Sequence, residues 1–319
     1  MKAEPFAPPR WLANRHAQTI WGAKCVAAPR PRLRRERWET PDGDFVDVDF
    51  VDGPAGTPWV HMYHGLEGSS NSPYARTLMQ RVAERGWRGS VFHFRGCSGE
   101  PNRLARAYHS GDSDEIDWSV RRIAERAAGP VFASGVSLGG NALAKWLGER
   151  GEAAAECVQA AVVISAPLDL MAAGEALDRG FARLYARHFL ATLKRTALHK
   201  LERFPGIYDG AKVRASRSLR DFDNVVTAPL HGFRDTDDYW TRASSRPHLA
   251  AVRVPTLVIN ARDDPFLPEA SLPDERDVSA AVKLEFPSRG GHVGFVSGPF
   301  PGNIEWLPQR VLHFFDYRQ

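Results

Sequence analysis

The sequence predicts an α/β protein with a doubly wound, mainly parallel sheet and one helical insertion. The first strands of this sheet are expected to be antiparallel. Short apolar runs alternate with longer stretches of helical periodicity, which is typical of strand–helix–strand units. One interval of roughly 80 residues breaks this alternation and shows only helical spacing. The 319 residues are 43% hydrophobic and 25% charged, as in globular domains that bury a full core.

The N-terminal part is expected to hold an arm and a hairpin. Residues 1–30 are rich in Pro, Arg and Trp and lack a clear period, so we expect an arm packed on a core domain that spans residues 31–319. Residues 34–39 and 45–51 alternate in polarity around Pro41-Asp42-Gly43-Asp44. Turn residues between two alternating segments predict a β-hairpin.

The remaining core elements follow from the apolar runs. Strands are expected at residues 59–63, 90–94, 131–133, 160–164, 256–260 and 282–286. Helices are expected near residues 73–85, 112–127, 138–149 and 303–316. Between about 168 and 250 only helical spacing appears, which predicts a helical cap inserted between two core strands. In such sheets, ligands bind beyond the carboxyl ends of the strands.

Composition narrows the expected partners and location. The 42 basic and 38 acidic side chains give a net charge of +4, which is small for a chain of 319 residues. The basic run at residues 30–37 leads into a predicted strand. This favours a solvated strand face over a nucleic-acid surface. Cys25, Cys97 and Cys157 are widely spaced, which indicates reduced thiols and a cytoplasmic location. No signal peptide or membrane span is expected, whereas peripheral lipid contact and oligomeric state stay open.

A sharp turn after one predicted strand carries a candidate nucleophile. Gly135-Val136-Ser137-Leu138-Gly139 stands between a predicted strand and a predicted helix. In this setting G-x-S-x-G exposes the serine hydroxyl at the strand tip and requires small residues two positions before and after it. The helix N-terminus then offers free N–H groups to an oxyanion. The alternative is that Ser137 only caps the helix.

A base and an orienting acid also follow predicted strands. His292 lies in Gly290-Gly291-His292-Val293-Gly294, and three glycines around one histidine indicate a loop shaped for that side chain. Asp263 and Asp264 follow another strand, from which a carboxylate can reach the imidazole. The spacing favours Asp264, and Asp263 is then expected to cap the turn. The alternative for His292 is an ordinary loop histidine.

Two glycine-containing loops are expected to complete the site. The candidate oxyanion donors are the backbone N–H groups of Leu66 and Leu138. Leu66 lies in the segment 64–68, whose two glycines let the backbone approach a substrate. His64 is expected to form a structural hydrogen bond rather than to act on the substrate. The second loop, at residues 94–100, is expected to line the pocket floor.

These segments together resemble the YheT-type branch of the α/β-hydrolase superfamily, which includes abhydrolase esterases and lipases. The resemblance spans nearly the whole chain. It is carried by residues 15–19, 64–69, 93–100, 108–111, 135–140, 263–266 and 290–295. It implies a serine carboxylesterase that hydrolyses short- to medium-chain acyl esters or monoacylglycerols, with a triad at Ser137, Asp264 and His292.

The expected reaction is acyl transfer without a cofactor or metal. Ser137 attacks the ester carbonyl, His292 moves the proton, and Asp264 orients His292. Activity is expected to fall on the acid side as His292 becomes protonated. The alternatives are thioester or amide hydrolysis on the same scaffold, or a degenerate hydrolase that acts as a binding module. A nucleotide-binding oxidoreductase is excluded because no G-x-G-x-x-G follows a strand.

Overall fold

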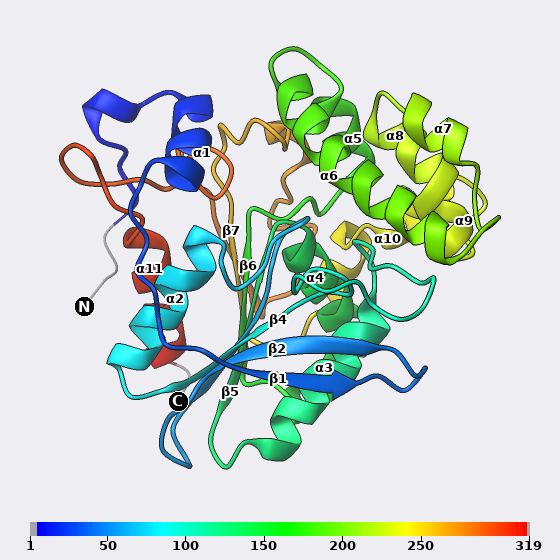
Figure 1. Cartoon of the computed structure of the whole chain (residues 1–319). Coiled ribbons are helices and arrows are strands. Elements are labelled where there is room, and N and C mark those ends of the chain that lie inside the picture. The colour runs from blue at the N-terminus through cyan, green and yellow to red at the C-terminus, as the bar shows by residue number, and fades with distance from the viewer. Residues whose placement is uncertain (1–4, 318–319) are drawn as a thin grey trace.

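The computed structural model describes residues 5–317 and contains an eight-stranded sheet (Figure 1). The strand order is β1-β2-β4-β3-β5-β6-β7-β8. β2 runs antiparallel to β1 and β4, whereas every later pair is parallel. The bounds are β1 Arg34–Glu39, β2 Phe45–Val51, β3 Trp59–Tyr63, β4 Arg88–Phe92, β5 Val131–Val136, β6 Ala160–Ile164, β7 Thr256–Ile259 and β8 Val282–Glu285. The predicted fold class is confirmed.

Two strands differ from their predicted bounds by two residues or more, and β7 and β8 each end one residue earlier than predicted. β4 begins and ends two residues early, because Gly89 pairs with both neighbouring strands. Beyond this strand the N–H of Phe94 donates to the imidazole of His64. β5 continues past its apolar run because Ser134 and Gly135 pair with β6. Small and polar residues conceal a strand in the sequence when it is central and paired on both sides.

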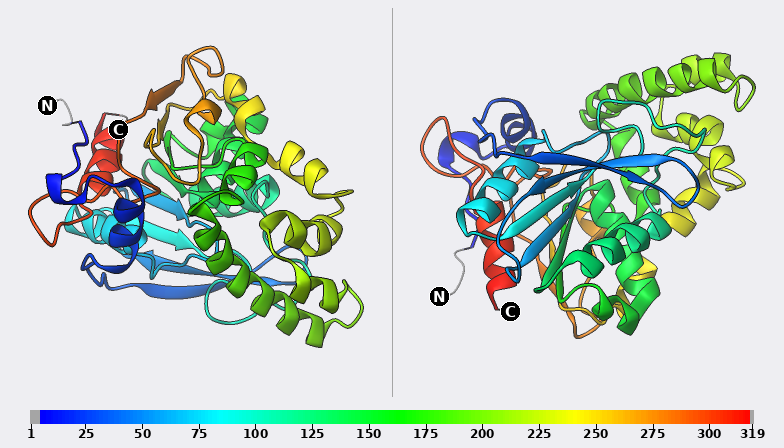
Figure 2. Two further views of the ribbon diagram at one scale, coloured as in Figure 1. Left: turned by 90° about the horizontal axis from the view of Figure 1, so that it is seen from above. Right: turned by 60° about the horizontal axis from the view of Figure 1, so that its bottom comes forward.

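Helices cover both faces of the sheet (Figures 1 and 2). Their bounds are α2 Pro73–Glu84, α3 Ser113–Arg126, α4 Leu138–Arg150 and α11 Trp306–Asp316. α2 and α11 pack on one face, where Val82 and Val311 belong to one buried apolar cluster. α3 and α4 pack on the other, where Ile116 and Trp146 belong to a second cluster. The two clusters hold the carboxyl edge of the sheet in place.

Between β6 and β7 the chain forms helices (Figure 1). They are α5 Leu170–Leu177, α6 Ala182–Arg203, α7 Gly210–Ala215, α8 Leu219–Phe222, α9 Ala228–Leu230 and α10 Thr236–Ala243, with a π-helical segment Asp223–Thr227 and a 3-10 segment Arg246–Ala251. This is the interval in which the sequence predicts a helical insertion. That it acts as a cap stays a prediction. No helix within residues 5–317 is long and apolar enough to cross a membrane.

The N-terminal segment contains a helix that the sequence analysis did not predict. α1 Arg15–Lys24 is capped by Asn14, whose side chain accepts two N–H groups of the first turn. The helix packs through polar and small residues, among them Gln18 and Gly22, so no apolar period marks it. Gln18 exchanges hydrogen bonds with the backbone of Val296, which fastens α1 to the loop after β8. Residues 1–4 of the predicted arm lie outside the described residues.

Candidate active site

Ser137 occupies a sharp turn between β5 and α4. Its φ of 52° lies in the left-handed region, an arrangement that costs about 1–3 kcal/mol for a non-glycine residue and clusters at functional sites. The turn depends on its glycines, since a Cβ added to Gly135 would lie 2.5 Å from the carbonyl oxygen of Gly139. The side chain of Ser137 makes no capping hydrogen bond to α4. Its hydroxyl is therefore directed to another partner.

That partner is His292. Ser137 Oγ lies 3.0 Å from His292 Nε2, and His292 Nδ1 lies 2.8 Å from Asp264 Oδ2. An ionised carboxylate only accepts hydrogen bonds, so it places the imidazole proton on Nδ1 and leaves Nε2 to accept from the serine. The ring of Phe266 stacks on the imidazole with centroids 4.1 Å apart. Asp264 is 3% exposed, and its other oxygen accepts the Phe266 N–H.

The backbone of the histidine loop is held by side chains from three parts of the chain. Asp263 Oδ1 accepts from the N–H of Gly291 at 3.0 Å, and burial raises the pKa of Asp263. The N–H of His292 donates to Thr19 Oγ1 at 2.9 Å, and the next N–H donates to Ser165 Oγ at 3.2 Å. The two aspartates therefore differ in role, one contacting the imidazole and the other the loop that carries it.

Thr19 is a residue of this site that the sequence does not predict. Its segment, residues 15–19, stands out only through the family resemblance, and no local pattern shows that it reaches His292. The one local signal is Asn14, a residue type favoured at helix N-caps. That signal could have located α1, but not its contact 273 positions along the chain.

The predicted oxyanion loop lies against the serine turn. A Cβ added to Gly65 would lie 3.2 Å from the Cβ of Ser137. The N–H of Gly65 donates to Tyr74 Oη at 2.9 Å, which fixes one side of the loop. Within residues 5–317, the N–H groups of Leu66 and Leu138 donate to no other residue. Both are free to donate to a bound molecule.

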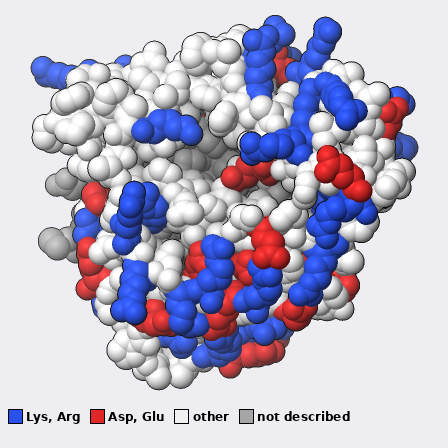
Figure 3. Space-filling model, viewed as in Figure 1, with Lys and Arg blue, Asp and Glu red and all other residues white. Residues whose placement is uncertain are grey.

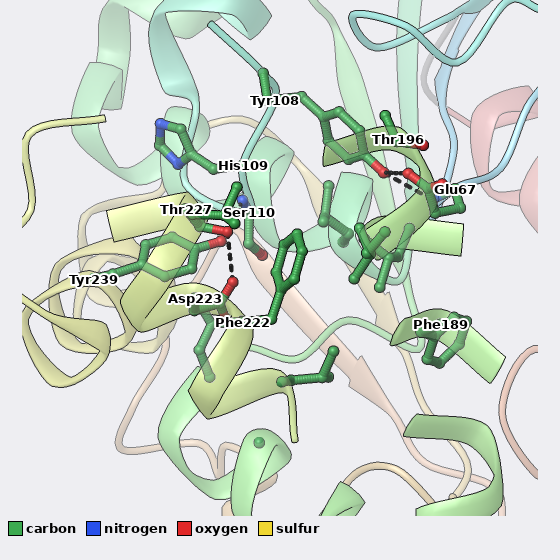
Figure 4. Close-up of a pocket in the computed structure, with 18 of the residues that line it drawn as sticks. Glu67, Tyr108, His109, Ser110, Phe189, Thr196, Phe222, Asp223, Thr227 and Tyr239 are labelled. Carbon is green, nitrogen blue, oxygen red and sulfur yellow. Dashed lines mark hydrogen bonds between the residues drawn. The ribbon is translucent and has the colours of Figure 1, made fainter. Parts of the chain in front are cut away.

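Glu67 and Tyr108 form a reciprocal pair on the other side of this loop (Figure 4). The N–H of Glu67 donates to Tyr108 Oη at 2.9 Å, and the Tyr108 hydroxyl donates to Glu67 Oε1 at 2.7 Å. The pair supports a φ of 54° at Glu67. Burial raises the pKa of the Glu67 carboxyl, which favours its neutral form. The sequence does not predict this pair, because Glu67 and Tyr108 lie 41 positions apart.

His64 joins the two glycine-containing loops. Its Nδ1 lies 2.7 Å from the carbonyl oxygen of Gly65, and its Nε2 accepts from the N–H of Phe94 at 3.1 Å. Burial lowers the pKa of His64 to about 3, so the ring is neutral with its proton on Nδ1. These bonds are the structural role that the sequence predicts. In the second loop, burial raises the pKa of Cys97, the opposite of what a thiolate nucleophile needs.

Two pockets meet at Ser137, His292 and Leu66. The first extends beneath the helices between β6 and β7 and is lined mainly by apolar side chains. Figure 4 shows Glu67 and Tyr108 at one side of this pocket and Asp223 at the other. The second pocket lies between α1, the oxyanion loop and α11. The pockets thus offer two directions away from the serine, as the acyl and alcohol parts of an ester require.

The arrangement supplies the groups that acyl transfer needs: a hydroxyl nucleophile, an oriented base and free N–H donors. The described part of the chain holds no group of three or more His, Cys, Asp or Glu side chains arranged to bind a metal ion.

Comparison with known proteins identifies the family. The model of the alpha/beta hydrolase fold matches residues 58–299, which contain Ser137, Asp264 and His292. The chain belongs to the alpha/beta hydrolase family. Its resemblance to the YheT branch is confirmed as well. The chain is 40% identical over 321 residues to YheT of Escherichia coli, provisionally named an esterase, with 96% of this chain and 91% of YheT covered.

Other relatives and solved structures agree. Phospholipase ABHD3 of Mus musculus is 30% identical, with 98% of this chain and 78% of that protein covered. A monoacylglycerol lipase of Saccharomyces cerevisiae is 27% identical over 82% of this chain and 59% of its own length. The esterase Pf2001 of Pyrococcus furiosus shares the fold, with a TM-score of 0.57, 15% identity and coverage of 92% and 98%. The protein is a carboxylic ester hydrolase of the esterase and lipase type.

Proposed function

We propose that the protein hydrolyses short- to medium-chain acyl esters or monoacylglycerols through a triad of Ser137, His292 and Asp264. The observation that carries the proposal is the line of hydrogen bonds from Asp264 through both imidazole nitrogens to Ser137 Oγ. A structural serine or histidine has no need of this order of donors and acceptors. The same order prepares a serine hydroxyl to lose its proton.

The reaction proceeds in two acyl transfers. Ser137 Oγ attacks the ester carbonyl carbon while His292 Nε2 takes the hydroxyl proton, and Asp264 stabilises the imidazolium. The N–H groups of Leu66 and Leu138 bind the oxyanion. His292 then gives the proton to the leaving alcohol oxygen. Water, deprotonated by His292, attacks the acyl enzyme and releases the carboxylic acid and free Ser137.

The substrate range rests on the first pocket. Its lining includes Leu170, Leu177 and Leu193, so an aliphatic acyl chain can leave water there. The relatives named above as a monoacylglycerol lipase and a phospholipase act on glycerol-based lipids, which supports acylglycerols as substrates. The second pocket then receives the alcohol part of the ester.

The test is a panel of nitrophenyl esters of increasing acyl length together with monoacylglycerols. Wild-type protein should turn over the panel with a preferred length, and Ser137→Ala should lose nearly all activity. Ser98→Ala is the matched control, because Ser98 stands in a glycine-containing loop but its hydroxyl donates to Asp47. A folded wild type inert to the whole panel, or a Ser137→Ala variant as active as wild type, overturns the proposal.

A further inference from the structure

Large apolar side chains lie exposed around α1 and the start of α6. Phe300 is 71% exposed and Leu184 is 51% exposed. The apolar collar, as we call this surface, consists of Trp11, Ile20, Phe181, Leu184 and Phe300. Among the described residues one further large apolar side chain, Tyr317 at the end of α11, is comparably exposed. Exposed aromatic and aliphatic side chains gathered at one place mark an interaction surface.

Ring contacts join the two sides of the collar through α1. Trp21 of α1 packs against Trp11 and Phe300, with centroids 5.5 Å and 5.9 Å away. One turn earlier on the same helix, His16 packs against Phe181 of the α6 side at 4.4 Å. α1 therefore contacts two aromatic groups of the collar, one around Trp11 and Phe300 and the other around Phe181.

The collar adjoins the second pocket. Ile20, one member of the collar, lines this pocket together with Lys24 of α1, Tyr185 and His188 of α6, and Ser137. The pocket therefore connects the edge of the collar with the serine. A protein seated permanently on the collar would close this route, whereas a layer of ester lipid would supply it.

Several cations around the collar are unpaired. Residues 5–33 and 179–201 contain no Asp or Glu. Within these ranges Arg10, Arg15, Lys24, Arg183 and Arg187 are exposed and form no ion pair with another described residue, whereas Arg179 pairs with Glu175. In Figure 3 the upper left region, where α1 lies in Figure 1, is white with isolated blue side chains. Cations at the rim of an apolar surface complement anionic lipid headgroups.

The β1–β2 hairpin makes the contrast plain. Its arginines Arg34, Arg35 and Arg37 each pair with an aspartate of the same hairpin: Asp52, Asp49 and Asp47 respectively. Figure 3 shows red and blue side chains side by side over this region. The three β1 arginines of the basic run at residues 30–37 are therefore neutralised, whereas the five cations named near the collar have no such partner.

We propose that the apolar collar docks on a bilayer surface that contains anionic phospholipid, where an ester lipid enters the second pocket. Apolar side chains of the collar would insert among the lipids, and the surrounding cations would lie at headgroup level. The entry of substrate rests on the proposed function, whereas docking itself needs no catalysis.

Docking is tested with the full chain carrying Ser137→Ala, which cannot consume the vesicles. Its binding to phosphatidylglycerol vesicles is measured by co-sedimentation and by the fluorescence shift of its tryptophans, with phosphatidylcholine vesicles beside them. We expect binding to the anionic vesicles that weakens with added salt. Replacing Leu184 and Phe300 by Ser should weaken binding by about tenfold or more, because insertion scales with buried apolar area. Tyr317→Ser is the control, an exposed side chain away from the collar, and should bind as before.

Activity separates this proposal from the previous one. In active protein, Leu184→Ser with Phe300→Ser should keep its turnover of a soluble nitrophenyl ester, since neither residue lines a pocket that reaches Ser137. If Ser137→Ala binds vesicles through the collar while wild type hydrolyses no ester, docking stands and the proposed function fails. Docking is overturned by absent vesicle binding, by equal binding of the collar variant, or by a dimer in sedimentation that the collar variant dissociates.

Discussion

The two halves of the candidate site are built in different ways. One half is the carboxyl edge of the parallel sheet, where Ser137, Asp264 and His292 follow β5, β7 and β8. The other half is the covering layer, formed by α1 and the helices between β6 and β7. Ladder hydrogen bonds position the strands of the first half, whereas side-chain hydrogen bonds such as those of Gln18 and Thr19 join α1 to it. Changes at the sheet edge should abolish turnover, and changes in the covering layer should moderate it.

The largest effect is expected from the two neighbouring aspartates. Asp264→Asn should lower kcat by about 10³- to 10⁴-fold, because an amide favours the wrong imidazole tautomer. Asp263→Asn should cost far less, since an amide oxygen still accepts the N–H of Gly291. Steady-state kinetics on one nitrophenyl ester measures both. Equal losses in the two variants would contradict the distinct roles of these residues.

The oxyanion loop should respond next. Tyr108→Phe removes the partner of the Glu67 N–H, so the loop should shift and kcat should fall by roughly 10- to 100-fold, less than loss of an oxyanion donor outright. Glu67→Gln keeps an acceptor for the Tyr108 hydroxyl and serves as the control. Unchanged turnover in Tyr108→Phe would show that this pair does not position the oxyanion loop for catalysis.

The protonation state of Glu67 should also affect activity as a function of pH. Burial raises the pKa of Glu67, so its neutral form persists above the ordinary carboxyl range and the carboxylate forms as pH rises further. A negative charge beside the oxyanion opposes the transition state. The ratio of wild-type to Glu67→Gln activity should therefore fall with rising pH. A ratio constant from pH 5 to pH 9 would show that this carboxyl does not face the developing charge.

Within the covering layer, Thr19 should affect the histidine loop. Thr19→Val removes the acceptor of the His292 N–H, which should lower kcat by about tenfold and stability by about 1–3 kcal/mol. Thr77→Val is matched, because both hydroxyls donate to the carbonyl four residues earlier but Thr77 makes no contact with the site. Equal kinetics for the two variants would show that the contact between Thr19 of α1 and His292 does not affect catalysis.

The smallest effect is expected at the far side of the first pocket. Burial raises the pKa of Asp223 to about 6, although its oxygens accept from Thr227 and Trp240. The folded state therefore holds this proton more tightly than the unfolded state, and stability is lost as pH rises from about 4 through 6. Between pH 4.5 and pH 7.5 the free energy of unfolding of the wild type should therefore fall by about 1–3 kcal/mol through this group, and Asp223→Asn should not show that fall. Denaturant unfolding of both proteins at the two pH values measures the difference. Parallel pH profiles of the two proteins would contradict this burial effect.

The same two halves explain what the sequence could predict. Ser137 and His292 stand out because their turns need glycine at fixed positions, such as Gly135, and a local requirement leaves a local pattern. The fold class follows from the alternation of apolar runs with helical stretches. These features depend on residues close together in the chain and can therefore be predicted from the sequence.

The covering layer leaves little trace in the sequence. α1 packs through Gln18 and Gly22, so the apolar stripe that reveals most helices is missing. Thr19 and Tyr108 act through contacts with residues far along the chain, which no spacing rule reports. The start of β4 was misjudged for a related reason, since Gly89 belongs to a strand only through its two neighbours.

Covalent labelling measures whether His292 activates the hydroxyl of Ser137. Folded wild-type protein is treated with a fluorophosphonate, and the adduct is located by peptide mass spectrometry. If His292 activates Ser137, a single adduct forms on Ser137, is lost in His292→Ala and is kept in Ser98→Ala. A wild type that stays unlabelled, or a His292→Ala variant labelled as fast as wild type, would contradict it.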